Sequence, residues 1–552
     1  MLKKIKSYFS YTFEGKDKKT IRKEQLLAIL SGVLMGASFP PSPLFFLSFI
    51  ALIPLFFVWK ERKTLASINR VTYYFGLGFT IVTLYWVGSW TKDADPFLML
   101  SGTALIFFNP LLFLIPSTLF HYARKNFKIE TAFMLLPFFW VFYEYIYSLT
   151  DLRFPWIVLG HGLAMFRSFI QIADTIGSIG LSFLVVAINS AIFFAIEKPK
   201  KEKIKFAVIG LLLFIMPLIY GFVKISNYDK GEKSVRVGLI QPDLNPWKKW
   251  EAGNLEEQIK LYTDLSNKAI EDSARVIIWP ETGLPVYFRS RAYNLQRNAL
   301  HKFIINNDIS LLTGMPDRFI YSKEDAPEDA KKVPQRDIYY TSYNSLWGMI
   351  PESENIQAYQ KMLLVPFGEF TPFAGSLPFL REFIQWGVGI GNWNIGQNVT
   401  VMNFPKRMGS GFENDIKVGG VICIESIFQE FVTRFVNEDA DFIAVVTNDS
   451  WYGNSSGPRQ HKYIGVLRAV ENNRSVVRCA NGGISCIISP VGEIEKETEM
   501  FTRDVLVGDV TIKSEKTFFT RNPNLLPYLS VIITLLNILF LFIKRKSGKE
   551  NE

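Results

Sequence analysis

The sequence predicts a multi-span α-helical membrane domain joined to an α/β domain that lies outside the cytoplasm. Long apolar runs fill residues 1–223 and 523–543, whereas residues 224–522 have the composition of an ordinary soluble domain. The uneven distribution of Lys and Arg among the segments that connect the apolar runs predicts which side of the membrane each segment occupies.

Eight apolar runs are expected as membrane helices, because crossing a bilayer takes about 20 residues of helix. They lie near residues 25–41, 43–59, 71–90, 97–121, 130–149, 177–196, 204–223 and 523–543. A soluble core rarely holds so many nearly uncharged runs in tandem, so buried core helices are the weaker alternative. The first run follows a Lys-rich start and resembles a cleaved signal peptide. Because six further spans follow it within residues 1–223, we expect an uncleaved first helix.

The basic residues predict the orientation of the chain. With a cytoplasmic N-terminus, the cytoplasmic segments are 1–24, 60–70, 122–129, 197–205 and 544–552. They carry 24 Lys and Arg residues, whereas the opposite short loops carry only Lys92, Arg153 and Arg167. Seven helices within 1–223 then place 224–522 outside the cytoplasm. The helix at 523–543 returns the chain to a basic cytoplasmic tail at 544–552.

The net charge of +10 belongs to these cytoplasmic segments. Residues 224–522 contain 34 Lys and Arg against 37 Asp and Glu, so this domain is slightly acidic. Nucleic-acid binding requires a basic surface, and no nucleic-acid partner is expected. The four histidines are scattered and form no ligand cluster, so we expect neither a metal nor a cofactor.

Residues 224–522 alternate between strand-like and helix-like segments. The strand candidates are 235–241, 276–280, 309–315, 343–350, 417–425, 441–449, 475–481, 484–490 and 505–512. Many are unbroken Val/Ile runs, which are typical of strands covered on both faces. The helix candidates are 254–272, 293–307 and 460–474. The pattern predicts an α/β domain with helices layered over sheets.

Three segments each place a reactive group just beyond a strand-like run. "VIIWPET" contains Glu281, "AYQKMLLVPFGEF" contains Lys361 and Glu369, and "GGVICIES" contains Cys423 and Glu425. A thiol, a carboxylate base and a lysine suffice for acyl transfer, because the thiolate is the nucleophile and an ammonium stabilises both thiolate and oxyanion. The structural alternative is that Glu281 ends a turn, Lys361 is solvated and Cys423 fills core space.

The quoted motifs resemble the Glu–Lys–Cys motifs of the nitrilase, or carbon–nitrogen hydrolase, superfamily. The matching stretches are "WPET" at 279–282, Lys361 followed by "VPFGEF" at 365–370, and "CIES" at 423–426. Residues 447–461, 468–494 and 142–162 resemble the apolipoprotein N-acyltransferase branch of that superfamily. The resemblance implies a nitrilase-like α-β-β-α sandwich for the extracytoplasmic domain.

By matching position, the resemblance implies a role for each group. Cys423 would be the nucleophile, Glu281 the general base that deprotonates it, and Lys361 the group that stabilises the oxyanion. The backbone N–H of Ile424 would be a second oxyanion donor. Glu369 would orient Lys361 or assist proton transfer.

Further positions carry less certain roles. Glu425 resembles a further family acid near the nucleophile. Trp250 resembles an aromatic residue that lines the acyl site, although Trp247 is close enough to leave the register open. Asn448 and Trp451 follow a buried strand and either shape the substrate pocket or only end the strand. Many relatives have Tyr where this chain has Ile424, so this chain offers no aromatic ring at that position to contact an acyl chain.

The resemblance also implies ping-pong chemistry at a membrane surface. The Cys423 thiolate would attack an acyl ester of a phospholipid, expected to be the sn-1 ester of phosphatidylethanolamine, and form a thioester. The α-amine of the diacylglyceryl-cysteine at an apolipoprotein N-terminus would then accept the acyl chain. The implied location is the bacterial cytoplasmic membrane, with the catalytic domain on the periplasmic side. We expect a monomer.

Two other classes of function stay open. One is a membrane-tethered nitrilase-type amidase that hydrolyses a C–N bond, with water attacking the thioester. The other is a transporter or sensor with a catalytically inactive outer domain. The intact set of Glu281, Lys361 and Cys423 counts against the transporter or sensor. The apolar loop 366–396 counts against the amidase, whose water-soluble substrate would not need it. This loop either dips into the membrane interface or packs on its own domain.

Two further features are ambiguous in the sequence. Glu144 lies within the fifth span, where it either contacts Arg153 or a lipid headgroup or only reaches the interface. Cys479 and Cys486 flank "ANGGIS", which predicts a hairpin whose two cysteines face each other. They would then either form a disulfide or fill core space. Cys479 is also the rival nucleophile.

Overall fold

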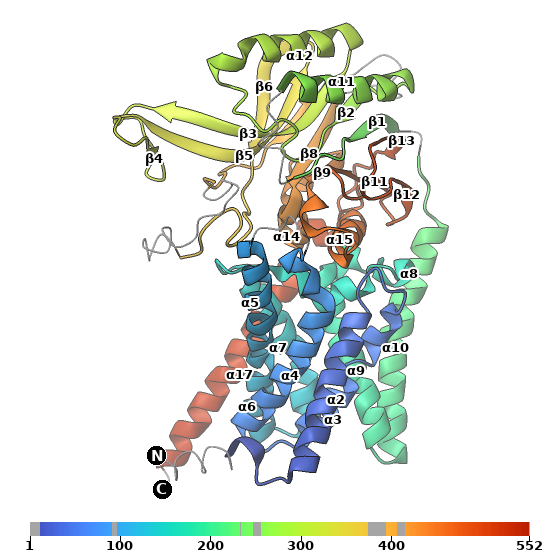
Figure 1. The fold of residues 1–552 in the computed structure, drawn as a ribbon. Coiled ribbons are helices and arrows are strands. Elements are labelled where there is room, and N and C mark those ends of the chain that lie inside the picture. The colour runs from blue at the N-terminus through green and yellow to red at the C-terminus, as the bar shows by residue number, and fades with distance from the viewer. Residues whose placement is uncertain are drawn as a thin grey trace. The chain divides into compact units, whose positions relative to one another are not determined.

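The computed structural model describes residues 11–90, 96–231, 233–246, 255–373, 393–405 and 415–550. The chain divides into two compact units (Figure 1). The helical unit comprises Met1–Gly88, Leu100–Asn227 and Asn522–Glu552, and the α/β unit comprises Ser89–Met99 and Tyr228–Arg521. Trp247, Trp250 and most of the predicted loop 366–396 lie outside the described residues.

The helical unit contains most of the predicted spans. Its main helices are α2 (Lys18–Ala37), α3 (Ile53–Lys60), α4 (Leu65–Leu84), α5 (Pro96–Leu112), α6 (Leu114–Asn126), α7 (Ile129–Ser148), α8 (Arg167–Ile170), α9 (Ala173–Glu197), α10 (Lys200–Ser226) and α17 (Leu525–Glu550). Within the described residues, six helical segments are long and apolar enough to cross a membrane: Leu65–Gly88, Leu98–Asn126, Ile129–Ser148, Ala173–Glu197, Lys200–Ser226 and Leu525–Lys544. They coincide with six of the eight predicted spans.

The two remaining predicted spans have a different character. Residues 43–59 form a 3₁₀-helix, Phe45–Phe49, followed by α3, and together they are shorter than the six long segments. The span predicted at 25–41 falls on α2, which is 20 residues long. The crossing of the membrane by these two segments stays a prediction.

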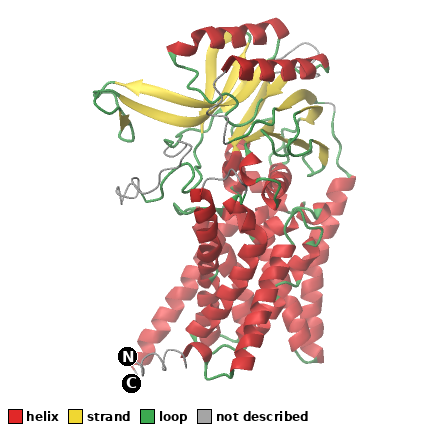
Figure 2. Ribbon diagram, in the orientation of Figure 1, coloured by secondary structure: helices red, strands yellow, loops and turns green. Residues whose placement is uncertain are grey.

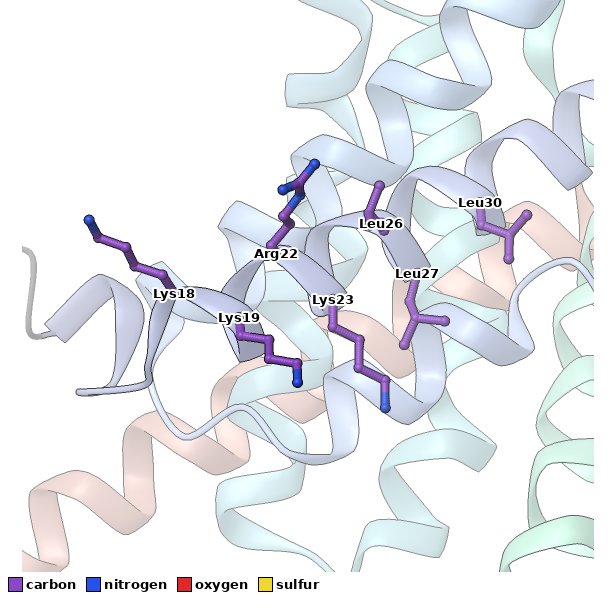
Figure 3. A pocket seen from close by; sticks show the side chains of 7 residues that line it. All are labelled: Lys18, Lys19, Arg22, Lys23, Leu26, Leu27 and Leu30. Carbon is purple, nitrogen blue, oxygen red and sulfur yellow. The ribbon is translucent and has the colours of Figure 1, made fainter.

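One face of α2 changes from basic to apolar along its length. Figure 3 shows the side chains that line a shallow pocket on this face, and they belong to Lys18, Lys19, Arg22, Lys23, Leu26, Leu27 and Leu30. Leu26 and Leu30 are 57% and 46% exposed. Basic side chains followed by exposed leucines suit a helix that enters a bilayer from its headgroup region.

Buried polar side chains connect helices inside this unit. The Asn189 side chain of α9 accepts a hydrogen bond from the Leu52 N–H (2.9 Å) and donates to the Ser48 carbonyl (2.8 Å). Glu24 of α2 accepts two hydrogen bonds from the Arg62 guanidinium, at 2.8 and 2.6 Å. Both partners of this ion pair are buried, and the bidentate geometry offsets part of the cost of burying two charges.

The Glu144 carboxylate of α7 binds the backbone of a turn, at Leu159, and the indole of Trp140. Its Oε1 atom accepts hydrogen bonds from the Leu159 N–H at 3.0 Å and from the Trp140 indole at 3.2 Å. Leu159 begins the buried 3₁₀-helix Leu159–Leu163. The carboxylate therefore fixes this turn against α7, where the sequence left a contact with Arg153 open.

The α/β unit contains two sheets between two layers of helices, as Figure 2 shows. The first sheet has the order β13-β1-β2-β3-β5-β4, with β6 paired to β5, and the second has the order β12-β11-β10-β9-β8-β7. The strands are β1 (Ser234–Gln241), β2 (Val276–Ile278), β3 (Ser310–Tyr321), β4 (Lys331–Lys332), β5 (Tyr339–Ile350), β6 (Ser353–Gln360), β7 (Val401–Phe404), β8 (Ile416–Ile422), β9 (Phe442–Thr447), β10 (Val476–Ala480), β11 (Cys486–Ile488), β12 (Ile494–Glu497) and β13 (Asp504–Thr511).

Each sheet carries its own helices. Helices α11 (Leu255–Glu271) and α12 (Asn294–Asn307) pack on the first sheet, and α14 (Gln429–Asn437) and α15 (Ser456–Asn472) pack on the second. The parallel central strands β1–β3 and β8–β10 are mostly buried, and the end of β3, residues 318–321, is exposed or half-buried. The predicted nitrilase-like α-β-β-α sandwich is confirmed.

The glycine pair in "GGVICIES" lets both neighbouring layers approach β8 closely. A Cβ atom at Gly420 would lie 2.3 Å from Leu346 of the other sheet. A Cβ atom at Gly419 would lie 2.8 to 3.0 Å from side chains on α14 and the neighbouring strand. A larger residue at either position would push these side chains away, so the glycine pair sets how closely they pack on the strand that precedes Cys423.

Candidate active site

Three strand ends bring a glutamate, a lysine and a cysteine into one region. Glu281 follows β2, Lys361 follows β6 and Cys423 follows β8. The Lys361 Nζ atom lies 3.5 Å from Glu281 Oε1 and 2.8 Å from Glu369 Oε1. Lys361 is 1% exposed. Its side chain is therefore an ion-pair partner of both carboxylates, and the solvated alternative for Lys361 is wrong.

The charge on Lys361 is stabilised by these partners. Burial alone would lower the pKa of its ammonium, but the carboxylates of Glu369 and Glu281 outweigh burial and raise that pKa above its ordinary value. The ammonium therefore remains charged at neutral pH. A fixed positive charge in a site of low dielectric is suited to stabilising a developing oxyanion.

Cys423 occupies an unusual backbone conformation at the start of a short 3₁₀-helix, Cys423–Ile427. Its φ angle is +49°, a region that costs a non-glycine residue about 1 kcal/mol or more. The pKa of its thiol is raised to about 12, chiefly by burial and also by the Glu281 carboxylate, while Lys361 acts in the opposite direction. The resting group is therefore the thiol, so a base must remove its proton before it can attack.

We expect the alkylation of Cys423 by iodoacetamide to be slow at neutral pH and to rise about tenfold per pH unit, because only the thiolate reacts. The second-order rate constant is measured from pH 7 to 9.5 by mass spectrometry of the Cys423 peptide. A rate that is already constant between pH 7 and 8 would contradict a protonated resting thiol.

Asn344 of β5 is a site residue that sequence reasoning missed. Its side-chain amide donates hydrogen bonds to Glu281 Oε1 at 2.8 Å and to Glu369 Oε1 at 3.1 Å. One buried amide thus aligns both carboxylates that flank Lys361. The only signal in the sequence is a single asparagine within an otherwise largely apolar strand.

Replacing Asn344 with leucine should lower acyl-transfer activity about 10- to 100-fold, because both carboxylates lose a neutral donor and shift against Lys361. The initial rate and the unfolding temperature are measured together. Asn355→Leu, on the exposed part of β6, is the matched control. An unchanged rate in Asn344→Leu would show that the carboxylates are aligned without this amide.

Glu425 connects the lysine segment to the cysteine segment. Its Oε1 atom accepts hydrogen bonds from the Met362 N–H (2.7 Å) and the Tyr359 hydroxyl (2.6 Å). Its Oε2 atom accepts from the Ile422 N–H at 2.9 Å. Burial raises the pKa of Glu425 to about 7. The structure thus gives Glu425 a positioning role that the sequence left uncertain.

Glu369 also joins two parts of the site through its carboxylate, in this case Lys361 and the backbone at Val365. Its Oε2 atom accepts a hydrogen bond from the Val365 N–H at 2.9 Å, while Oε1 contacts Lys361. This arrangement matches the expected role of orienting Lys361. The side chain of Ile424 is only 3% exposed, so it packs in the interior at the position where many relatives have tyrosine.

The candidate substrate-binding residues are held by their neighbours. Asn448 Oδ1 accepts a hydrogen bond from the Asn481 side chain at 3.2 Å, and the Trp451 carbonyl accepts one from Ser89 at 2.6 Å. Contacts of Asn448, Trp451 and Trp250 with a substrate stay predictions. Within the described ranges, no group of three or more His, Cys, Asp or Glu side chains is arranged to hold a metal ion.

The predicted register, in which Cys479 faces Cys486, is wrong, and of the two alternatives both side chains fill core space. In the antiparallel pair β10–β11, Cys486 faces Arg478, and all three cysteines are free. A shift of one residue places neighbouring side chains on opposite faces of a sheet, so the two thiols point apart. Cys479 is fully buried and its Sγ atom lies 3.2 Å from the Ile278 carbonyl. It is a core residue rather than a rival nucleophile.

Comparison with known proteins identifies relatives over nearly the whole chain. Residues 31–191 match the family described as apolipoprotein N-acyltransferase N-terminal domain, and residues 236–517 match the carbon-nitrogen hydrolase family. A protein of Chlorobaculum tepidum named apolipoprotein N-acyltransferase is 31% identical over 94% of this chain and 96% of its own length. A protein of the same name from Geobacter metallireducens is 30% identical over 91% and 92%. Among solved structures, a Nesterenkonia AN1 amidase from the nitrilase superfamily is 17% identical to this chain, with a TM-score of 0.35. The matched region covers 50% of this chain and 90% of the amidase chain.

Proposed function

This chain belongs to the apolipoprotein N-acyltransferase family, and from that premise we propose that it carries the transferred acyl chain on Cys423. The acyltransferase activity on lipoproteins follows from the relatives. The observation that supports the covalent route is the buried Lys361 ammonium, which contacts two carboxylates at the strand ends beside Cys423.

In the first half-reaction, the Glu281 carboxylate takes the proton from the Cys423 thiol. The thiolate attacks the ester carbonyl of a phospholipid, and the negative charge that develops on the carbonyl oxygen is stabilised by Lys361 and by the N–H of Ile424. The C–O bond then breaks, and the leaving lysophospholipid oxygen receives the proton from Glu281. A Cys423 thioester and neutral products remain.

In the second half-reaction, the α-amine of a diacylglyceryl-cysteine attacks the thioester carbonyl. The C–S bond breaks, the Cys423 sulfur leaves as a thiolate, and Glu281 passes the proton of the amine back to that sulfur. The products are an amide on the lipoprotein N-terminus and the starting thiol. The single carboxylate therefore acts as base and acid in turn.

The membrane part explains how two lipid-anchored substrates meet. Both donor and acceptor are held in a bilayer, so a membrane-embedded enzyme brings them together at high effective concentration. We assign the enzyme to the bacterial cytoplasmic membrane, with the α/β unit on the periplasmic side. The distribution of basic residues supports this orientation. The expected donor is phosphatidylethanolamine.

Trapping of the acyl-enzyme tests this proposal. The purified protein is incubated with phospholipid labelled in its acyl chain, quenched in acid and treated with hydroxylamine. Wild type and Cys479→Ala should form a hydroxylamine-labile adduct, and Cys423→Ala should form none. Label that persists in Cys423→Ala contradicts the proposal.

The acceptor distinguishes an acyltransferase from an amidase-type hydrolase. Addition of a synthetic diacylated lipopeptide should move the label from the protein to the peptide amine. Release of free fatty acid alone, with no labelled peptide, would show that water is the acceptor and would favour the hydrolase.

A further inference from the structure

A buried polar group lies behind the nucleophile and contacts its backbone. The Nε2 atom of His461, on α15, lies 3.2 Å from the Cys423 carbonyl oxygen and 2.7 Å from the Ser426 hydroxyl. The Ser426 hydroxyl also donates to the Cys423 carbonyl, at 2.8 Å. On its other side, His461 Nδ1 lies 3.1 Å from Asp449 Oδ1 and 3.3 Å from Arg478. The four side chains other than Cys423 are all buried.

His461 is an uncharged imidazole at neutral pH. Burial lowers its pKa to about 4, and Arg478 pairs with Asp449 and neutralises that carboxylate. With the proton on Nε2, the ring donates toward the Cys423 carbonyl and the Ser426 hydroxyl, and Nδ1 accepts from Arg478, whose charge offsets the repulsion between Nδ1 and the nearby Asp449 oxygen. With the proton on Nδ1, the ring would donate to Asp449, Nε2 would accept from the Ser426 hydroxyl, and the carbonyl of Cys423 would lose both donors. A buried carbonyl needs a donor, which favours the Nε2–H form.

The Cys423 carbonyl belongs to the same peptide unit as the Ile424 N–H. In a trans peptide these two bonds lie in one plane and point in opposite directions. Whatever fixes the carbonyl therefore fixes the direction of the N–H. This control matters here because Cys423 has a positive φ angle of 49°, a conformation that persists only where the surroundings impose it.

We propose that His461 is a positioning residue that aims the Ile424 N–H at the oxyanion by holding the carbonyl oxygen of Cys423. The inference rests on the proposed function, in which that N–H stabilises the tetrahedral intermediate. His461 does not touch the substrate and exchanges no proton with the thiol. It acts through the peptide plane, with Ser426 as a second donor to the carbonyl and with Arg478, which is paired with Asp449, donating to Nδ1 of the ring.

Two amide substitutions separate the two ends of the imidazole ring. The amide of His461→Gln reaches the position of Nε2 and can still donate to the Cys423 carbonyl. The amide of His461→Asn reaches only the position of Nδ1, so it keeps the contact with Asp449 and loses the carbonyl. His301→Asn, on α12, is the matched control for the substitution itself, because His301 contacts only the Ile350 carbonyl among the interactions described.

Two reactions of the Cys423 sulfur are compared in each variant. The comparison shows whether a substitution impairs stabilisation of the oxyanion or the position of the thiol. Acylation by labelled phospholipid passes through an oxyanion, whereas alkylation by iodoacetamide does not. We expect His461→Asn to slow acylation about 10- to 100-fold and to leave alkylation within about threefold of wild type, because only the oxyanion donor is misdirected. His461→Gln should acylate within about threefold of wild type.

Three results would overturn the inference: an equal loss of acylation and alkylation in His461→Asn, unchanged acylation in that variant, or an equal loss of acylation in the Gln and Asn variants. Unfolding temperatures are measured for all variants. If His461→Asn does not fold, Ser426→Ala replaces it, with the same split expected between the two reactions. Cys423→Ala is run in parallel, and an adduct in that variant would sink the proposed function itself rather than the role of His461.

Discussion

Replacement of Cys423 by serine is expected to lower N-acyltransferase activity by about 10⁴-fold or more, the scale seen when an enzymatic nucleophile is removed. A serine hydroxyl is far less acidic than a thiol, so a carboxylate base such as Glu281 would generate far less of the attacking anion. The substitution changes one atom in a partly buried position, so the fold should survive. Turnover is measured as lipopeptide N-acylation in detergent or nanodiscs, together with the unfolding temperature.

The other two cysteines provide the controls for this prediction. Cys479→Ser and Cys486→Ser remove buried thiols, so they should cost stability, because a polar hydroxyl replaces an apolar side chain. They should not abolish chemistry. Activity of Cys423→Ser within about tenfold of wild type would show that another group carries the acyl chain.

The Glu281→Gln variant should show the second largest loss. The amide oxygen of glutamine still accepts the hydrogen bond that Asn344 donates to Glu281, but glutamine cannot take a proton. General base catalysis contributes about 10²- to 10⁴-fold, and we expect acylation to fall by this amount. Binding of the donor phospholipid, measured separately in Cys423→Ala/Glu281→Gln, should hardly change.

The pH profile distinguishes loss of the base from loss of structure. Hydroxide supplies thiolate in place of Glu281, so the acylation rate of Glu281→Gln should rise steadily from pH 7 to 9.5. Glu430→Gln, which changes a surface carboxylate paired with Arg434, should behave as wild type at every pH. If Glu281→Gln is as active as Glu430→Gln at pH 7, the base is another group.

The sequence predicted which segments form the site better than it predicted the side-chain contacts between those segments. Glu281, Lys361 and Cys423 could be identified because each lies within a recognisable motif, and Glu281 and Cys423 also follow apolar runs. Asn344 could not, because its only role is to donate to two carboxylates that come from other strands. The role of His461 was hidden for a similar reason: its contact with the Cys423 carbonyl joins residues 38 positions apart in the chain, and no local pattern encodes it.

For the fold, too, some elements could be predicted from the sequence and others could not. Unbroken Val/Ile runs predicted the central strands, which are buried on both faces. Strands β4, β6, β7 and β12 were missed, because they are short or mix polar with apolar residues, and they form by pairing with a neighbouring strand. The register of β10 and β11 was predicted from the glycine pair alone. The connection between the strands, residues 481–485, is longer than a two-residue turn, so Cys486 pairs with Arg478 instead.

The central claim is that the acyl chain is carried on the sulfur of Cys423, and peptide mass spectrometry of the acyl-enzyme tests it most directly. Wild-type protein is incubated with a phospholipid of one defined acyl chain, without acceptor, and digested in acid. The account predicts that the peptide containing Cys423 gains the mass of that chain and loses it in hydroxylamine. An unmodified Cys423 peptide in protein that is competent for turnover, or an acyl group on Cys479 or Lys361 instead, would contradict it.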